Sequence, residues 1–428
     1  MSEPDSPRGK GLARFRSVAL DVSPLKESPS YRALLAGQLI SVVGTQMAYV
    51  AVAYQVFALT NSTVAVGLIG LAEAVPLMLF SILGGAIADS RDRRSTMARA
   101  HLGMMLSSGA LALVSLAERP PLVLVFALVS VSSAVNAIDR PARTAIVPSL
   151  VSADNLPAAI ALRQVVFQTT QIIGPAVGGL MLAAFPIAWV YAIDAATFLA
   201  GLGSLYWVPR SVPVEGGHSG QAEAIREGLV FAFRTPLILS IFVVDLVAMV
   251  FGMPRAVFPE LAGETFGIGP EGLGLLYAAP SAGALCGALM SGWVRKVERQ
   301  GMTVLLAVVV WGVAITLAGL TVFSLILTLL FLAVAGAADV FSAVFRGTML
   351  IQNTPDPLRG RVSALNHMVV LGGPRLGDLE AGIVGGLVGA PASIVIGGAA
   401  CMVGTGLVAA RFPSLRHHRR SSGVGLGA

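Results

Sequence analysis

The sequence predicts an all-α, polytopic membrane protein built from twelve membrane-spanning helices. The composition is 55% hydrophobic and only 12% charged, whereas soluble domains usually carry about 25% charged residues. Three long stretches, residues 33–72, 300–338 and 381–410, contain no Asp, Glu, Lys or Arg. Since one spanning helix needs about 20 apolar residues, we expect several of these stretches to hold more than one span.

Polar breaks and turn residues divide the chain into the individual spans. The predicted spans are residues 33–58, 65–88, 97–117, 121–138, 157–184, 187–208, 237–260, 273–293, 302–319, 322–345, 362–388 and 392–410.

The distribution of basic residues predicts which way the spans face. The chain starts with the polar stretch MSEPDSPRGK and lacks the apolar core of a signal peptide, so we expect the N-terminus to stay in the cytoplasm. With that orientation, all but five of the 29 Lys and Arg lie on the cytoplasmic side. The exceptions are Arg119, in an outer loop, and Arg163, Arg255, Arg346 and Arg375, within spans. Positive charge is poorly translocated, which predicts an inner, cytoplasmic membrane protein with both termini in the cytoplasm.

A polar stretch, residues 209–236, divides the spans into two sets of six. We expect a cytoplasmic tail (1–30), a six-helix bundle (31–208), this cytoplasmic linker (209–236), a second bundle (237–410) and a basic tail (411–428). Within the linker, Ile225, Leu229 and Phe233 recur every four residues, which predicts a short helix on the membrane surface, with a solvated loop as the alternative.

An internal repeat supports two pseudo-symmetric halves. The stretch that opens at Gly85, GAIADSRDRR, ends the second span, and the stretch that opens at Gly287, GALMSGWVRKVERQG, ends the eighth. Glycines followed by basic residues therefore recur at matching places. Transporters built from repeats bind their substrate near the midplane between the halves.

The loop after the second span has the spacing G-x-x-x-D followed by arginines. The aspartate can cap the positive end of a neighbouring helix, and the arginines can pair with acids at nearby inner helix ends, most obviously the one in NAIDRPAR. Such a network would latch the cytoplasmic face shut, although simple topology anchoring is an alternative. The predicted cytoplasmic gate comprises Gly85, Asp89, Arg93, Arg94, Asp139 and Arg143.

The fifth span contains QIIGPAVGG. Gly174, Gly178 and Gly179 would let two helices approach closely, while Pro175 removes a backbone donor and bends the helix. Ordinary helix packing is the alternative to a part in the transport mechanism.

Together these motifs resemble the major facilitator superfamily, in the branch of enterobactin-type siderophore exporters and macrolide efflux proteins. The resemblance covers residues 31–411 and includes NAIDRPARTAIVPSLVSADNLPAAIAL, PRAVFPELA, RGTMLIQNTPDPLRGRVSALN and GPRLGDLEAG. It implies the major facilitator fold. The G-P-x-x-G-G element of the fifth span is associated with exporters of this superfamily, which implies export rather than import.

Charged residues inside the spans are the candidates for proton coupling or a substrate cavity. Each costs at least roughly 3 kcal/mol at the bilayer centre unless it faces protein or water. Asp339 and Arg346 are two turns apart and share a helix face, whereas Arg375 and Asp378 have the spacing of a local pair, whose alternative role is structural. The candidates are Asp245, Asp339, Arg346, Arg375, Asp378 and, on another side of its helix, Glu380.

Other polar residues in the spans are assigned structural roles. Glu73 and Asp194 lie nearer the outer helix ends, where we expect their side chains to be hydrated. His367 is interpreted as a packing residue rather than a proton relay. The two cysteines, Cys286 and Cys401, fall inside spans as small apolar fillers, so neither a disulfide nor a metal site is expected.

These observations predict a monomeric secondary exporter that works by alternating access in the lipid bilayer. It would move a small molecule, siderophore-like or drug-like, against an inward flow of protons. No nucleotide-binding motif, H-E-x-x-H motif or cofactor site is present, and the pI of about 9.7 reflects cytoplasmic loops rather than a nucleic-acid surface. The alternatives are an uptake symporter of the same fold, a channel and a polytopic membrane enzyme.

Overall fold

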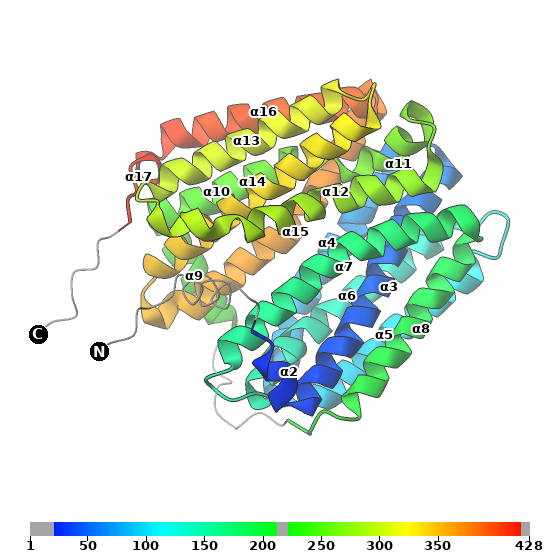
Figure 1. Ribbon diagram of the computed structural model, residues 1–428, viewed down its shortest axis with the longest axis horizontal. Helices are drawn as coiled ribbons and strands as arrows, with labels where there is room; N and C mark the ends of the chain where they lie inside the picture. Colours follow the sequence, from blue (N-terminus) through cyan, green and yellow to red (C-terminus); the bar gives the residue numbers. More distant parts are fainter. Residues whose placement is uncertain (1–20, 212–220, 421–428) are drawn as a thin grey trace, which may run out of the picture.

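The structure is a computed structural model that describes residues 21–211 and 221–420, and within them every regular element is a helix (Figure 1). The long helices are α3 (Pro29–Thr60), α4 (Thr63–Ser90), α5 (Arg93–Val114), α6 (Leu122–Ile146), α7 (Leu156–Ala184), α8 (Ile187–Leu205), α10 (Pro236–Phe251), α12 (Gly269–Leu289), α13 (Gln300–Leu320), α14 (Leu325–Gln352), α15 (Arg359–Val388) and α16 (Ala390–Arg411).

Short helices connect or flank them. These are α2 (Ser23–Glu27), η1 (Val147–Ser149), α9 (Gln221–Arg234), η2 (Arg255–Val257), α11 (Phe258–Glu260), η3 (Leu261–Thr265), η4 (Ser291–Lys296), η5 (Asp356–Leu358) and α17 (Pro413–Arg416).

The predicted spans correspond to these long helices. In the described part of the chain, eleven helical segments are long and apolar enough to cross a membrane by length and composition. The twelfth long helix, α15, is 30 residues long but carries Arg375, Asp378 and Glu380. The hydroxyl of Ser28 caps α3, that of Ser62 caps α4, and the N-terminus of α5 is capped by Asp92.

The seventh span differs from the prediction, because the expected helix over 237–260 breaks after Phe251. Gly252 ends α10, its carbonyl accepts a hydrogen bond from Trp311 Nε1 at 3.0 Å, and Pro254 has no backbone N–H to continue the helix. The chain then turns through η2, α11 and the π-helix η3. This break places Arg255 on an irregular segment between the two halves of the molecule.

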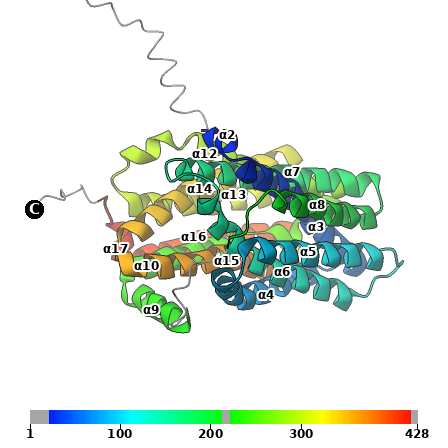
Figure 2. The same ribbon diagram turned by 90° about the horizontal axis from the view of Figure 1, so that it is seen from below.

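The long helices pack as two halves. Helices α3 to α8 form the N-terminal half, in which α3 contacts α7 and α8, α5 contacts α6 and α8, and α4 contacts α6. Helices α10 and α12 to α16 form the C-terminal half, in which α14 contacts α12 and α13, while α16 contacts α10 and α13. The halves meet through α4 against α15 and α7 against α12 (Figures 1 and 2).

The end of the molecule that holds the short helices α2, α9 and α17 is here called the terminal end, and the opposite end is called the far end. The tightest approaches between the halves lie toward the far end. A Cβ on Gly67 would lie 2.7 Å from the Asp378 carbonyl oxygen. One on Gly382 would lie 2.5 Å from the carbonyl oxygen of Thr63, whose hydroxyl donates to the Gly382 carbonyl at 2.9 Å. Backbone therefore contacts backbone where α4 crosses α15.

The small residues of the fifth span serve similar packing. A Cβ on Gly174 would lie 2.4 Å from Gln46, and one on Gly178 would lie 2.9 Å from Met47, both on α3. Gly179 instead packs against Gly274 of α12, and the carbonyl of Pro175 lies 2.6 Å from where a Gly274 Cβ would stand. The motif thus holds α7 against α3 within one half and against α12 of the other.

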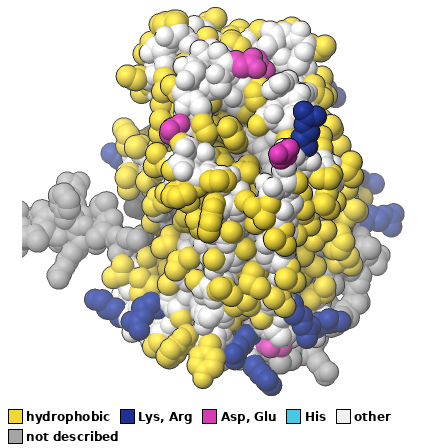
Figure 3. Space-filling view, turned by 90° about the vertical axis from the view of Figure 1, so that its right-hand side faces the viewer, with side chains coloured by type: hydrophobic (Ala, Val, Ile, Leu, Met, Phe, Trp, Pro, Cys, Tyr) yellow, Lys and Arg dark blue, Asp and Glu magenta, His cyan; other side chains and the backbone are white. Residues whose placement is uncertain are grey.

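The linker contains the predicted helix, α9, which packs against α15 and α10 at the terminal end (Figure 2). Glu227 forms an ion pair with Arg361 of α15, while Leu229 and Phe233 are exposed. Ile225 has no described side chain. Large apolar side chains also cover much of the molecule's outer face, with Lys and Arg gathered toward its edges (Figure 3), which is the pattern of a surface that meets lipid.

We predict that Gly67→Ala lowers the thermal unfolding midpoint in detergent, because the added methyl must push α15 away from α4. Overpacking of this kind costs about 1–3 kcal/mol. Gly109→Ala in α5 is the matched control, since nothing lies within 4 Å of a Cβ there, and it should be neutral or stabilising. Equal midpoints for the two variants would contradict the close packing described here.

Candidate functional site

The residues between the two halves form a polar group, here called the interbundle cluster. The N-terminal half contributes Tyr49 from α3 and Glu73 from α4. The C-terminal half contributes the other members from η2, α12 and α15, namely Arg255, Tyr277, Arg375 and Asp378.

Two polar contacts in the cluster join the halves directly. Arg375 Nη2 lies 3.0 Å from Glu73 Oε2, and the Tyr49 hydroxyl donates to Asp378 Oδ2 at 3.3 Å. Arg255 interacts electrostatically with both Tyr49 and Asp378. A charge inside the membrane is stabilised by such partners, so this cluster compensates its own charges across the interface.

Aromatic rings and a small cavity surround Asp378. The rings of Tyr49 and Tyr277 meet edge to face with centroids 5.6 Å apart, and the Tyr277 hydroxyl donates to the Arg255 carbonyl at 3.2 Å. Asp378 Oδ1 is buried without a hydrogen-bond partner. The cavity beside it has a volume of about 10 Å³, which is room for about one water molecule. A substrate-sized molecule therefore does not fit at this point in this conformation.

The predicted local pair of Arg375 and Asp378 is wrong. Arg375 pairs with Glu73 and donates to the Leu371 carbonyl, and Asp378 pairs with Tyr49. Both side chains turn toward α4 and α3, where partners in the other half are available. The expectation that Glu73 is a wet residue is wrong for the same reason.

Glu380 does not join the cluster. Leu376, four residues earlier, and Ile383, three residues later, share its helix face and are both more than 40% exposed. That face points away from α4, and no partner for Glu380 is found in the described part of the chain.

A second cluster lies within the C-terminal half. Arg346 Nη2 lies 2.8 Å from Asp245 Oδ1 and 3.8 Å from Asp339 Oδ1, and its Nη1 donates to Ser342 Oγ at 3.1 Å. Asp245 is buried, whereas the Asp339 side chain remains 31% exposed. The spacing of Asp339 and Arg346 correctly indicated a shared face, and Asp245 joins them from α10.

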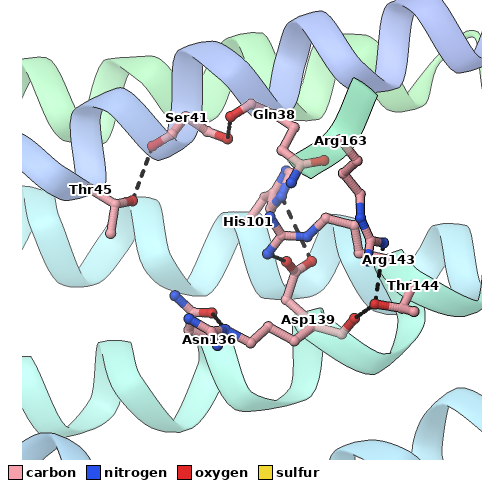
Figure 4. A network of polar contacts seen from close by, with 10 residues as sticks. Gln38, Ser41, Thr45, His101, Asn136, Asp139, Arg143, Thr144 and Arg163 are labelled. Atoms are coloured by element: carbon pink, nitrogen blue, oxygen red, sulfur yellow. Dashed lines mark hydrogen bonds and ion pairs between the residues drawn. The ribbon is translucent and has the colours of Figure 1, made fainter. Parts of the chain in front are cut away.

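A third cluster lies within the N-terminal half (Figure 4). Asp139 is fully buried and forms an ion pair with Arg143, one turn later on α6, while His101 Nε2 of α5 lies 3.7 Å away. His101 in turn packs against Gly201 of α8, where a Cβ would lie 2.7 Å from its Nδ1. The cluster ties three helices of one half together.

The expected pairing of loop arginines with Asp139 is therefore wrong in this conformation, because Asp139 is buried between α5 and α6 rather than at a helix end. Arg93 instead donates to the carbonyl of Ala145 at 3.0 Å and to Ser211 Oγ at 3.4 Å. Gly85 lies inside α4, and the Asp89 side chain lies outside the described residues. The remaining loop arginine, Arg94, is half-buried.

The sequence did not predict the roles of several residues in or near these clusters. Asp194, expected to be wet, is buried and accepts a hydrogen bond from Ser108 Oγ at 2.6 Å. Tyr49, Tyr277 and His101 had no signal in the sequence, because an aromatic or histidine in an apolar span usually only packs. Their roles depend on residues that are distant along the chain.

Comparison with known proteins identifies the family. The profile of the transmembrane secretion effector family matches residues 20–422. The chain belongs to this family. Its curated relatives include the enterobactin exporter EntS of Escherichia coli K12, which is 28% identical over 406 residues, covering 95% of this chain and 97% of that protein. The same exporter of Shigella boydii serotype 18 is 29% identical over 372 residues, covering 87% and 88%.

Solved structures confirm the fold. The nucleoside transporter NupG has a TM-score of 0.71 at 14% identity and covers 90% of this chain and 99% of its own. A bacterial homologue of the human lysosomal transporter Spinster has a TM-score of 0.70 at 15% identity and covers 92% and 98%. The member of the secretion effector family described here is thus a multi-pass membrane transporter with the major facilitator fold, not an enzyme.

We predict that Arg346→Gln destabilises the protein, because it leaves Asp245 buried without its partner. Breaking one side of a buried pair costs about 3–5 kcal/mol. The double variant with Asp245→Asn should recover part of this loss, which unfolding of all four forms in detergent would measure as a coupling energy. Strictly additive effects would mean that the two side chains do not interact.

Proposed function

We propose that the protein is a secondary active exporter of small molecules, siderophore-like or drug-like, and that it exchanges its substrate for protons by alternating access. The observation that carries this proposal is the similarity to the enterobactin exporter EntS, which extends over almost the whole of both chains. We further propose that the terminal end faces the cytoplasm, in keeping with the Lys and Arg that predominate in its loops and tails.

The packing supports a conformation that opens toward the terminal end. Close backbone approaches between the halves, among them Gly67 to Asp378 and Gly179 to Gly274, lie toward the far end. In alternating access the halves would rock until these contacts part and the terminal end closes. The substrate would then leave on the far side.

Coupling of proton movement to substrate transport would arise at the two contacts that join the halves. Opening the far end must separate Glu73 from Arg375 and Tyr49 from Asp378. A carboxylate that loses its partner inside the membrane is costly unless it takes up a proton or meets water. We propose that Asp378 is protonated from the far side when these contacts part, and releases the proton when they form again. Asp339, whose side chain is 31% exposed beside Arg346, is the second candidate.

The decisive test uses inverted membrane vesicles with an imposed pH gradient, with enterobactin and erythromycin as probes. We expect gradient-driven uptake of at least one probe by the wild type, and a loss of ten-fold or more in Asp378→Asn or Asp339→Asn while equilibrium binding persists. Asp356→Asn, an exposed acid of η5 paired with Arg359, is the matched control and should transport normally. Full transport in both test variants would remove these acids from the coupling mechanism, and movement with rather than against the proton flow would indicate a symporter.

The loop between α4 and α5 is proposed as part of the cytoplasmic gate. Arg93 fastens this loop to the end of α6 and to Ser211, so we expect Arg93→Glu to slow transport several-fold by letting these segments separate. Arg91→Glu is the control, because Arg91 is exposed. Transport and protein abundance would be measured in the same vesicles. Equal rates for the two variants would leave the loop with an anchoring role alone.

A further inference from the structure

A cavity opens at the terminal end of the C-terminal half, apart from the polar clusters described above. Its volume is about 380 Å³, which is within the range of small-molecule binding pockets. One wall comes from α9 and α10 and contains Phe233, Pro236 and Leu239. The other wall comes from the end of α16 and from α17, and it contains Arg411, Phe412 and Ser414. Figure 2 shows α9, α10 and α17 together at this end of the molecule.

Both walls of the cavity are held in place by contacts outside it. Leu415 of α17 is fully buried, and the backbone amide of Arg420 donates to the carbonyl of Glu298, before α13, at 2.7 Å. The opposite wall is fixed by the ion pair that holds α9 to α15. The cavity is therefore bounded on both sides by segments that are fastened to the C-terminal half.

The cavity lies at the depth where two apolar spans end. Pro236 is the first residue of one candidate membrane span, and Arg411 is the last residue of another. Leu239 lies about one turn farther into the first span, whereas Ser414 lies beyond the end of the second. One side of the cavity therefore borders the hydrocarbon layer, and the other side borders the polar headgroups.

The lining combines apolar side chains with one cation and one hydroxyl. The guanidinium carbon of Arg411 lies 5.7 Å from the centroid of the Phe412 ring, and in the described part of the chain this arginine forms no ion pair. Among the described residues, no Asp or Glu lines the cavity. An arginine without an acidic partner is a good donor to a phosphate, because its planar fork can donate two parallel hydrogen bonds to an oxyanion.

We propose that this cavity binds one anionic phospholipid of the adjoining leaflet. The phosphate would contact Arg411 and Ser414, and the start of an acyl chain would lie against Phe233 and Leu239. Basic pockets between membrane-spanning helices bind acidic lipid headgroups. A free phosphate lacks the apolar part that the wall of α9 and α10 would contact, and a phosphatidylcholine headgroup carries a cation that would oppose Arg411. The bound lipid would join α9 and α10 to α16 and α17.

The first test compares two lipids that share their acyl chains and differ in headgroup charge. Native mass spectrometry of the purified full-length protein would measure the dissociation constant of the first bound lipid, for palmitoyl-oleoyl phosphatidylglycerol and for palmitoyl-oleoyl phosphatidylcholine. We expect phosphatidylglycerol to bind at least five-fold more tightly. Equal binding of the two lipids overturns the proposal, because no anionic headgroup is then recognised.

Two variants at exposed positions locate the site. Arg411→Gln removes the cation and should abolish the preference for phosphatidylglycerol, while Ser414→Phe fills the cavity without changing its charge and should weaken binding at least five-fold. Arg299→Gln is the matched control, because Arg299 is exposed before α13 and does not line the cavity. It should bind like the wild type. An equal loss in Arg299→Gln and Arg411→Gln, or unchanged binding in Ser414→Phe, would contradict this site.

A final arm separates a lipid from a soluble anion. Glycerol 3-phosphate would be added in large excess to the complex with phosphatidylglycerol, and we expect it to displace no lipid, because it has no acyl chain. Displacement would assign the cavity to a soluble phosphate compound and overturn the lipid assignment. These measurements involve no transported substrate, so their outcome is independent of the proposed exporter function.

Discussion

Charged side chains held inside a hydrocarbon layer need partners, and in this protein those partners come largely from neighbouring helices. Asp245 and Arg346 join α10 to α14, Asp139 and its neighbours join α6 to α5, and Glu73 and Arg375 join α4 to α15. Each unpaired charge would cost at least roughly 3 kcal/mol. The rotation of each helix about its axis is therefore restricted by the charges it carries.

These pairs differ in what they hold together. The pair on α10 and α14 lies within the C-terminal half, and the pair on α5 and α6 lies within the N-terminal half. In the proposed rocking motion both pairs would stay intact, and each half would move as a rigid unit. The contacts of Arg375 and Asp378 lie between the halves, and they are formed while the far end is closed. In the proposed transport cycle these contacts would have to part, so the opening of the far end would depend on the charge state of a few side chains.

The sequence predicted the number of long helices, their approximate ends and the residues that share a face of one helix. Asp339 and Arg346 are an example, because the period of an α-helix fixes their relative direction. It did not predict the partners of Arg375 and Asp378, since the choice between a neighbour on the same helix and one on another depends on how the helices rotate against each other. It also missed the break at Gly252, which is stabilised by a hydrogen bond from Trp311, far away in the sequence.

The same distinction applies to the candidate site. Residue type and membrane depth were enough to select Asp245, Asp339, Arg346, Arg375 and Asp378 as candidates, and all five lie in polar clusters. Glu380 satisfied the same criteria but lies on an exposed face of α15. A side chain's position along a helix decides the direction in which it points, and so which neighbouring helix it can contact. Tyr49 and His101 carry no charge pattern that could distinguish them from packing residues.

The two ends of the linker are fastened to different halves. Ser211 exchanges backbone and side-chain hydrogen bonds with Asp92 and Arg93 of the N-terminal half, while α9 is held to α15 by Glu227 and Arg361. Only residues 212–220 separate Ser211 from the start of α9, and a chain of that length spans at most about 35 Å when fully extended. The length of this connection therefore limits how far apart Ser211 and the start of α9 can lie in any conformation of the protein.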